Sequence, residues 1–516
     1  MIFLKNCIII LLLTLSTNSC NNKKILYGLP SYIDDTINNI TSEGFYIQTV
    51  NFPTGASIDE KVEMSAKLIP TQKQLDWQKM ELTAFIHYGM NTFTDRGWGS
   101  GTEKPSQFTP TKVDVNQWVT TLKNAGFKLI VLTVKHHDGF CLWHTKTTKH
   151  SVEYSPYKKD IAKEFSDACR AQGIKVGFYL SPWDMNAESY GKGEEYNDFF
   201  TEQLTELLTQ YGTVDEIWLD GAKDEKYNKK QEYDFKRWMD LINKLHPNCI
   251  TANLGLDARW AGNEGGYARE AEWSAQAYKP AAYMDAAYNE KYGLKPTNED
   301  LGSRNILEKV PALFWFPAEV DVSIRTPTAA AADGIEDQWF FHAGKQRVRS
   351  LNELLDIYYK SVGRNANLLL NFPVNKDGVI PTEDVNRIND FKNYLNSTFS
   401  TGFFKDKDTS WINVNNGKSK EYKLSSKTQV NVLVIQEDIS KGQRVESFSI
   451  EYFDNTTSEW KNVTLAQISQ KTKTIGYKRI IKFNTAVTTD KIKITINETR
   501  LPANIASVNV YYSANY

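Results

Sequence analysis

Short runs of β-branched and aromatic residues alternate with longer amphipathic stretches between about residues 70 and 390. This alternation predicts parallel strands joined by helices. The predicted strands cover residues 83–87, 129–135, 176–180, 216–220, 249–253, 271–274, 313–320 and 367–372. Eight such units predict a TIM-like (β/α)8 barrel. A doubly wound open sheet is the alternative, although no glycine-rich phosphate loop follows the first strand.

The stretches between these strands have helical periodicity and end at residues that stop helices. The predicted helices cover residues 115–125, 160–172, 195–211, 232–245 and 351–362. Four of them are followed directly by glycine, and the fifth is followed by His246-Pro247. A helix that ends in glycine before an apolar strand is the junction expected in a βαβ protein. The helix ends therefore support the barrel.

The pattern changes beyond about residue 396, where apolar and polar residues alternate with period two. The alternating runs cover residues 430–435, 447–452, 479–483, 491–496 and 507–512. Turns that contain Asn, Thr or Gly separate these runs, as in an all-β sandwich. We therefore expect a barrel over residues 67–393 and an all-β sandwich domain over residues 394–516.

The N-terminus has the pattern of an export signal. Lys5 precedes a short apolar run over residues 7–13, which is too short to span a bilayer. Small and polar residues then lead to Cys20, and Asn and Lys follow it, as at a bacterial lipoprotein cleavage site. We therefore expect a signal peptide over residues 1–20, a lipid anchor at Cys20 and an N-terminal extension over residues 21–66. The expected location is the bacterial cell envelope, as a periplasmic protein or an outer-membrane lipoprotein, with secretion as the alternative.

Composition narrows the classes of partner. The chain has 516 residues and a net charge of −1, so nothing indicates nucleic acid as a partner. Aromatic residues make up 12%, including 13 Trp and 26 Tyr, a modest indication of carbohydrate binding because flat rings stack on sugar C–H faces. Outside the signal the cysteines are Cys141, Cys169 and Cys249, whose wide spacing predicts buried free thiols rather than disulfides or a zinc site.

Polar and aromatic residues concentrate at the predicted strand ends, where barrels of this type carry their chemistry. They include three of the seven histidines and several carboxylates: His87, His136, His137, Tyr179, Trp143, Trp183, Asp220, Arg259, Glu272 and Glu319. Asp220 ends the apolar run Ile217–Leu219 and precedes Gly221. It is either a reactive carboxylate or a cap for the turn that follows, since Asp before Gly often caps turns.

Two chemistries could use this set of residues. In metal-assisted hydrolysis His87, His136 and His137 would be the ligands, but the sequence has no HxH or HExxH spacing to support a metal. Glycoside hydrolysis instead needs two carboxylates on either side of one bond and donors for sugar hydroxyls. Asp220 and a later Glu would then react, while histidines and aromatic rings bind the sugar. No cofactor motif occurs, and we expect neither a cofactor nor a metal.

Several motifs, read in order, resemble those of the α-L-fucosidases of glycoside hydrolase family 29. They are FIHYG, KHHDGF, GFYLSPWD, EIWLDGA, RWAGNEGG, EAEWS and WFPAEVDVSIR, and the resemblance runs from about Trp77 to Phe391. The GNE and WFPAEVDVSIR segments resemble the subgroup that acts on α-1,3/1,4-linked fucose in branched glycans. The C-terminal sandwich resembles the galactose-binding-like modules that often follow such barrels.

The resemblance implies a retaining, exo-acting α-L-fucosidase whose partner is a fucosylated oligosaccharide or glycoconjugate. It implies that Asp220 is the nucleophile and Glu264 the general acid/base. The substrate-binding positions that it implies are His87, Trp98, His136, His137, Tyr179, Trp143, Arg259 and Trp339. A membrane would be a partner only through the lipid at Cys20.

The chain also departs from the family pattern. Gly97 stands before Trp98, where relatives commonly have Glu, so either another acid such as Glu103 takes that role or the sugar preference differs. Tyr88 stands where Trp is common. The link between Arg325 and the aromatic stretch at Trp339 is longer than usual. Two alternatives therefore stay open: a glycosidase of the same fold that prefers a related sugar such as L-galactose, and an inactive glycan-binding lipoprotein.

Overall fold

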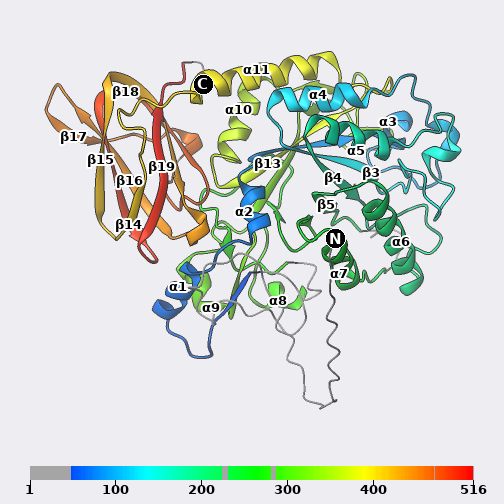
Figure 1. Ribbon diagram of the computed structural model, residues 1–516, viewed down its shortest axis with the longest axis horizontal. Coiled ribbons are helices and arrows are strands. Elements are labelled where there is room, and N and C mark those ends of the chain that lie inside the picture. The colour runs from blue at the N-terminus through cyan, green and yellow to red at the C-terminus, as the bar shows by residue number, and fades with distance from the viewer. Residues whose placement is uncertain (1–47, 224–229, 281–285, 470, 515–516) are drawn as a thin grey trace, which may run out of the picture.

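A computed structural model describes residues 48–223, 230–280, 286–469 and 471–514. A helix-covered parallel sheet forms one end of the molecule and an antiparallel sheet forms the other (Figure 1). The predicted signal peptide, Cys20 and the extension as far as residue 47 lie outside the described residues. Within the described ranges, no helix is long and apolar enough to cross a membrane.

Eight parallel strands form the sheet that carries the candidate chemistry. They are β2 (Leu82–His87), β3 (Leu129–Lys135), β4 (Lys175–Leu180), β5 (Glu216–Leu219), β6 (Ile250–Asn253), β7 (Arg259–Trp260), β10 (Ala318–Ser323) and β13 (Ala366–Pro373). Their order is β6-β5-β4-β3-β2-β13-β10-β7. A parallel bridge between Ala252 and Ala258 joins the two ends of the sheet. The nearly closed ring of parallel strands confirms the predicted TIM-like barrel.

Six longer helices accompany the barrel strands, and α4 to α7 surround the parallel strands on the right of Figure 1. The six are α4 (Val115–Ala125), α5 (Ile161–Gln172), α6 (Glu194–Gln210), α7 (Phe235–Leu245), α10 (Leu351–Lys360) and α11 (Thr382–Phe399). The predicted helices are confirmed, with ends shifted by at most three residues. Helix α7 begins later than predicted because the side chain of Asp234 accepts the Arg237 backbone N–H and caps the helix. Helix α4 ends at Gly126, whose φ is +100°.

The prediction was wrong for two strands. Residues 271–274 are not a strand: side chains bond to several of their backbone groups, and the Ser274 carbonyl accepts the Phe316 N–H at 2.8 Å. Gln443 accepts the Ser274 N–H at 2.7 Å and donates to the Glu272 carbonyl at 3.0 Å. The predicted strand 313–320 is divided at Pro317, which has no N–H to donate. Its first part, β9 (Ala312–Trp315), leaves the barrel and pairs with β1 (Thr49–Asn51) and β8 (Ala275–Gln276).

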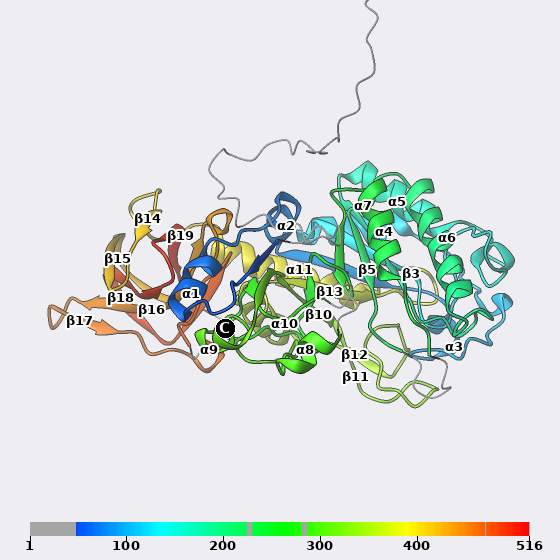
Figure 2. The ribbon, with the colours of Figure 1, turned by 90° about the horizontal axis from the view of Figure 1, so that it is seen from below.

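The short β7 takes the barrel position that the prediction gave to 271–274. It pairs with β10, and the Arg259 N–H donates to the Pro317 carbonyl at 2.9 Å. The remaining short elements are α1 (Ile58–Ala66), α2 (Gln72–Gln78), α3 (Met90–Thr94), α8 (Ala286–Lys291), α9 (Arg304–Lys309), β11 (Arg325–Pro327) and β12 (Gln346–Val348). The lengthened segment between β11 and β12 lies on the same side of the barrel as α3 (Figure 2).

The C-terminal domain is one antiparallel sheet with the order β14-β19-β15-β18-β16-β17. Its strands are β14 (Trp411–Val414), β15 (Lys418–Glu437), β16 (Val445–Asp454), β17 (Glu459–Asn462), β18 (Arg479–Thr499) and β19 (Ala503–Tyr511). The runs 479–483 and 491–496, expected as separate strands, both belong to β18. The register between β15 and β18 shifts twice, and the domain has an apolar core of its own. This sheet therefore packs around a hydrophobic core distinct from that of the barrel.

Candidate active site

The carboxyl ends of four neighbouring strands bring most of the candidate residues together. His87 is the last residue of β2, and the pair that follows β3 lies beside it: the His87 and His136 ring centroids are 5.8 Å apart, and those of His136 and His137 are 4.1 Å apart. Tyr179 from β4 stacks on His136 at 5.5 Å with an interplanar angle of 10°. Its hydroxyl donates to Asp220, which follows β5.

Two donors hold the Asp220 carboxylate in one orientation. Oδ1 accepts the Ala222 backbone N–H at 2.7 Å, and Oδ2 accepts the Tyr179 hydroxyl at 2.9 Å. His137 Nε2 lies 3.9 Å from Asp220 Oδ2, and 23% of the Asp220 side chain remains exposed. Asp220 therefore caps the turn with one oxygen and presents the other toward the histidine cluster. The two sequence interpretations of this residue are compatible.

The tautomer of His87 follows from its partner Asn371. The Asn371 amide nitrogen donates to Ser323 Oγ at 3.0 Å and to the Trp339 carbonyl at 2.9 Å, which leaves Oδ1 to face His87. His87 Nδ1 lies 2.8 Å from that oxygen and carries the proton. Nε2 then has a free lone pair, so it can accept a hydrogen bond from a hydroxyl group.

Burial keeps all three histidines neutral. It lowers the pKa of His87 to about 3, against the opposing hydrogen bond to Asn371. Burial also lowers the pKa of His136 and of His137, and for His137 the nearby Asp220 opposes this. Neutral imidazoles offer both a donor and an acceptor, as recognition of sugar hydroxyls requires.

Glu264 follows β7 on the loop at the exposed rim of the site. Its Oε2 accepts Trp339 Nε1–H at 3.2 Å, and its backbone carbonyl accepts the Gln338 amide at 3.1 Å. Desolvation of the carboxyl group by the surrounding protein raises its pKa above the usual value. The charge of Asp220 raises it further, while the Trp339 hydrogen bond lowers it. The two carboxyl groups thus have different environments, as an acid and a nucleophile require.

Three indole rings lie beside the histidine cluster, and one of them, the buried Trp183, has its ring centroid 4.8 Å from that of His137. Trp98 is 44% exposed, and its ring meets His137 edge to face at 6.0 Å. Trp339 lies against His87 with ring centroids 5.2 Å apart. An exposed flat ring next to polar groups is typical of a sugar-binding site.

Three acids below the rim each meet an indole N–H, and sequence reasoning missed two of them. Trp77 donates to Glu216 at 2.9 Å, Trp218 to Glu319 at 2.9 Å, and Trp260 to Asp321 at 2.8 Å. Burial raises the pKa of Glu216 to about 8 and raises those of Glu319 and Asp321 well above their usual values. Burial therefore favours the protonated, uncharged form of each of these groups. The alternation AEVDVS could have revealed Asp321, because it places Asp321 on the same face as Glu319.

Two residues expected to bind substrate, Trp143 and Arg259, do not lie among the strand-end residues around Asp220. Trp143 is fully buried in the hydrophobic core, and its Nε1–H donates to Glu206 of α6 at 2.8 Å. Arg259 alternates with the inward-facing Trp260 on β7, so it points away from the site and pairs with the buried Glu272. Burial lowers the pKa of Arg259 to about 10. Both motif residues hold the scaffold in place.

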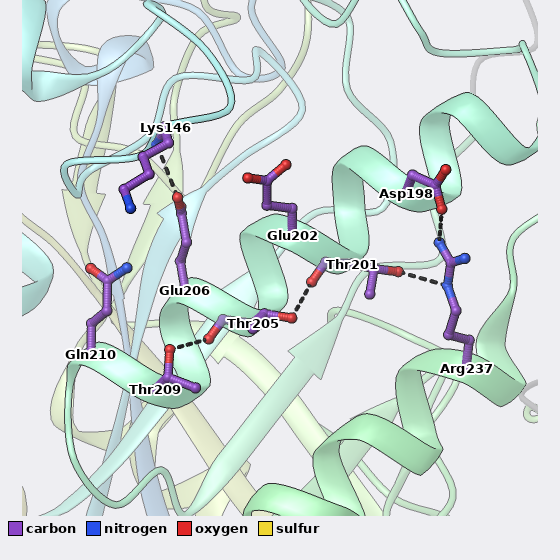
Figure 3. A pocket seen from close by; sticks show the side chains of 9 residues that line it. All are labelled: Lys146, Asp198, Thr201, Glu202, Thr205, Glu206, Thr209, Gln210 and Arg237. Atoms are coloured by element: carbon purple, nitrogen blue, oxygen red, sulfur yellow. Dashed lines mark hydrogen bonds and ion pairs between the residues drawn. The ribbon is translucent and has the colours of Figure 1, made fainter.

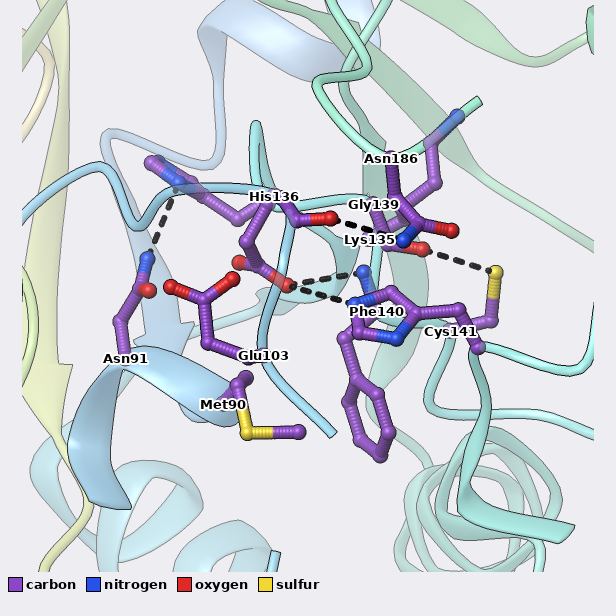
Figure 4. Close-up of polar contacts among 12 residues, drawn as sticks. Met90, Asn91, Glu103, Lys135, His136, Gly139, Phe140, Cys141 and Asn186 are labelled. Carbon is purple, nitrogen blue, oxygen red and sulfur yellow. Dashed lines mark hydrogen bonds and ion pairs between the residues drawn. The ribbon is translucent and has the colours of Figure 1, made fainter. Parts of the chain in front are cut away.

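Glu103, the acid considered as a substitute for a carboxylate at position 97, is drawn with Asn91 and His136 in Figure 4. It is 7% exposed, and Oε1 accepts the Ser100 N–H at 2.7 Å. Asn91, in the same close-up, donates to the Gly97 carbonyl at 3.0 Å. Neighbouring Asp138 has its pKa raised to about 8 by burial. Glu103 therefore holds the loop around residue 100 through its bonds to Ser100.

A groove along the outer face of α6 is lined by none of the residues grouped around Asp220 and Glu264 (Figure 3). It is lined by Lys146, Asp198, Thr201, Glu202, Thr205, Glu206, Thr209, Gln210 and Arg237. Thr205 and Thr209 each donate to the backbone carbonyl four residues earlier, and no aromatic ring lines the groove.

Within the ranges that the structure describes, no group of three or more His, Cys, Asp or Glu residues could hold a metal ion.

Comparison with known proteins gives one consistent result. A family model described as Alpha-L-fucosidase matches residues 56–310 and 318–398. The chain is 34% identical over 474 residues to Alpha-L-fucosidase 1 of Arabidopsis thaliana, covering 86% of this chain and 87% of the relative.

Solved structures agree with these matches. A putative alpha-L-fucosidase from Bacteroides ovatus has 47% identity and a TM-score of 0.85, covering 92% of this chain and 79% of that one. A Ruminococcus gnavus family 29 fucosidase in complex with fucose has 31% identity and a TM-score of 0.74, covering 87% and 96%.

The neutral state of His87 predicts a pH-dependent contribution to stability. Its pKa is about 3 when folded and about 6.5 in an unfolded chain, so the unfolded state binds more protons between these values. This contribution is complete above pH 6.5 and is lost as the pH falls toward 3, by up to about 1.4 kcal/mol per pH unit. Urea unfolding of His87→Gln should therefore show a shallower decline in stability from pH 6.5 to pH 4 than the parent. His144→Gln, at an exposed site, is the control, and equal slopes for parent and His87→Gln would contradict the assignment.

Proposed function

We propose a mechanism and a substrate class for this chain, which belongs to the α-L-fucosidase family, glycoside hydrolase family 29. It is a glycoside hydrolase with α-L-fucosidase activity, and its substrates carry L-fucose. The proposal adds residue roles, retention of anomeric configuration, a preferred linkage and a location. The difference in environment between Asp220 and Glu264 is the observation that carries the mechanism.

In the first step Asp220 attacks the anomeric carbon of fucose. The bond from that carbon to the leaving oxygen breaks, and Glu264 transfers its proton to the oxygen. The raised pKa of Glu264 supports this role, because the group must keep its proton until the leaving oxygen needs it. In the second step Glu264 takes a proton from water, and the resulting nucleophile displaces Asp220. Two inversions at one carbon retain its configuration.

The remaining strand-end residues bind the sugar in this proposal. His87 Nε2 accepts a hydroxyl proton, and His136 and His137 add further neutral contacts. Trp98 and Trp339 provide flat apolar faces for the C–H edges of the ring. Burial raises the pKa of Asp321 below them, which favours its protonated form and so avoids a further negative charge near Asp220.

We also propose a preference for fucose in α-1,3 or α-1,4 linkage to branched glycans. The support is the similarity of the GNE loop around Glu264 and of the WFPAEVDVSIR segment to that subgroup. A preference for L-galactose is the second candidate, because Gly97 has no side chain to contact the sugar hydroxyls where relatives commonly have Glu.

Replacement of Asp220 tests the nucleophile. Asp220→Ala should lower turnover of an activated aryl fucoside by roughly a thousandfold or more, because the covalent step is lost. Azide should restore part of the rate and yield a fucosyl azide of inverted configuration, since azide attacks directly from the vacated side. Asp198→Ala, an exposed carboxylate on α6, is the matched control. A near-parental rate for Asp220→Ala would assign the nucleophile elsewhere.

The indole hydrogen bond predicts the direction of a pH shift. Trp339 Nε1–H stabilises the carboxylate form of Glu264, so Trp339→Phe should raise the pKa of Glu264. Because Glu264 acts in its protonated form, the alkaline limb of kcat/KM against pH should move to higher pH. Trp460→Phe in the C-terminal sheet should leave the limb in place. An unchanged limb in Trp339→Phe would show that Glu264 does not control it.

Linkage preference is measured with two natural oligosaccharides. A Lewis-type trisaccharide should be hydrolysed with a much higher kcat/KM than a 2′-fucosylated one, and equal values would refute the branched-glycan proposal. Aryl fucoside and aryl L-galactoside assayed together test the second candidate, which requires the L-galactoside to be preferred. The two comparisons share an enzyme preparation, so an inactive sample affects both equally.

We propose that the protein is exported and anchored through a lipid on Cys20. The support is the short apolar run and the polar residues that flank the cysteine. Expressed in a bacterial host, the parent should partition into the detergent phase of a phase-separation assay, and Cys20→Ala should not. Cys7→Ala, a cysteine inside the apolar run, is the control. Detergent partitioning of Cys20→Ala equal to that of the parent would exclude this anchor.

A further inference from the structure

One loop, residues 331–342 between β11 and β12, connects the two sides of the candidate site; we call it the bridging loop. On one side it contacts the segment that carries Trp98. The Ala332 N–H donates to the Asp95 carbonyl at 2.6 Å. Asp333 Oδ2 accepts two adjacent backbone groups, the N–H of Gly97 at 3.0 Å and that of Trp98 at 3.1 Å. The position of Trp98 is therefore tied to a carboxylate more than 230 residues away in the sequence.

Gly97 permits the close approach of the bridging loop. A Cβ at this position would lie 3.2 Å from Asp337 Cβ and 3.4 Å from Ile335 Cγ2. The space that a larger side chain would enter is thus filled by the bridging loop itself. The Gly97 carbonyl on the opposite side accepts the Asn91 amide at 3.0 Å. The short segment before Trp98 is therefore bonded on both sides.

On its other side the bridging loop holds the acid. Asp337 accepts the Trp339 N–H at 2.7 Å and bonds to His342 Nε2 at 2.6 Å. This fixes the turn from which Gln338 and Trp339 reach Glu264. The same stretch of chain therefore contacts both the backbone of Trp98 and the carboxyl group of Glu264.

We propose that Asp333 is a positioning residue that fixes Trp98 against the bound sugar, which makes the bridging loop a specificity-determining element. A charged acceptor shared by two adjacent N–H groups is a strong and directional contact. The other oxygen, Asp333 Oδ1, is buried and has no hydrogen-bond partner among the described residues. An unpartnered buried oxygen is costly, and together with the two bonds to Gly97 and Trp98 this points to a role of the carboxylate in placing that segment. The proposal rests on the proposed function, because it assumes that Trp98 contacts fucose.

The choice of Trp98 as the residue that is positioned follows from its contacts. Its ring is 44% exposed and touches His137 and Trp183 only edge to face, at 6.0 Å and 5.5 Å. These contacts leave the ring face open. The backbone bonds to Asp333 therefore set where the ring lies relative to His137 and, through it, to Asp220.

A double-mutant cycle tests whether Asp333 acts through Trp98. Asp333→Ala should raise KM for an aryl fucoside and the Kd for L-fucose roughly tenfold with kcat within about threefold, since two charge-assisted bonds are lost. Asp333→Asn, which keeps an acceptor, should recover most of the affinity. Once Trp98 is changed to Ala, adding Asp333→Ala should have little further effect. Glu336→Ala, an exposed carboxylate on the bridging loop, is the matched control.

The outcomes separate this inference from the proposed function. If the parent hydrolyses the fucoside but the effects of Asp333→Ala and Trp98→Ala multiply fully, Asp333 does not act through Trp98 and the inference is wrong. An unchanged KM in Asp333→Ala overturns it as well. If the parent neither hydrolyses the fucoside nor binds L-fucose, the proposed function itself fails. Should Asp333→Ala not fold, Gly97→Ala enters the same cycle, because a Cβ there displaces the bridging loop and should raise KM only when Trp98 is present.

Discussion

The hydrogen bond from Tyr179 to Asp220 joins two neighbouring barrel strands at the point where the chemistry is proposed. Tyr179 pairs with Trp218 in the register between β4 and β5, so the sheet itself places the hydroxyl beside the carboxylate. Tyr179 also stacks on His136, so one side chain contacts both the histidine cluster and the Asp220 carboxylate. A shift of one residue in that register would turn these side chains to the opposite face of the sheet. The site thus depends on the pairing of β4 with β5 in the barrel.

Around that contact the protein keeps most ionisable groups uncharged. The three histidines are buried and neutral, and burial raises the pKa of Glu319 and of Asp321, which accept indole N–H groups. With so few charges nearby, Asp220 and Glu264 can differ in protonation state as the mechanism requires. Neutral donors and acceptors also suit a neutral sugar. Aromatic residues have a double use here, because their rings offer apolar faces and their N–H groups satisfy buried acids.

Sequence patterns predicted the local features and failed on contacts between distant segments. Strand β3 was predicted at both ends because a fully buried parallel strand is a continuous apolar run. The two-residue β7 has no periodicity to detect, and Pro317 divides a run that looks continuous. Trp143 and Arg259 were expected in the site because they lie inside motifs of the family. Trp143 instead donates to Glu206 in the core, and Arg259 points away from the site and pairs with Glu272. The bridging loop could not be paired with Trp98 because nothing in either segment specifies so distant a contact.

The central claim is that Asp220 forms a covalent bond to the sugar, and trapping that intermediate tests it most directly. A fluorinated fucosyl donor with a good leaving group slows the second step more than the first, so the fucosyl-enzyme should accumulate. Mass spectrometry of the digested protein should then show one added fluorofucosyl group on the peptide that contains Asp220. A label on a different carboxylate, or steady hydrolysis of the donor with no labelled peptide, would contradict the account.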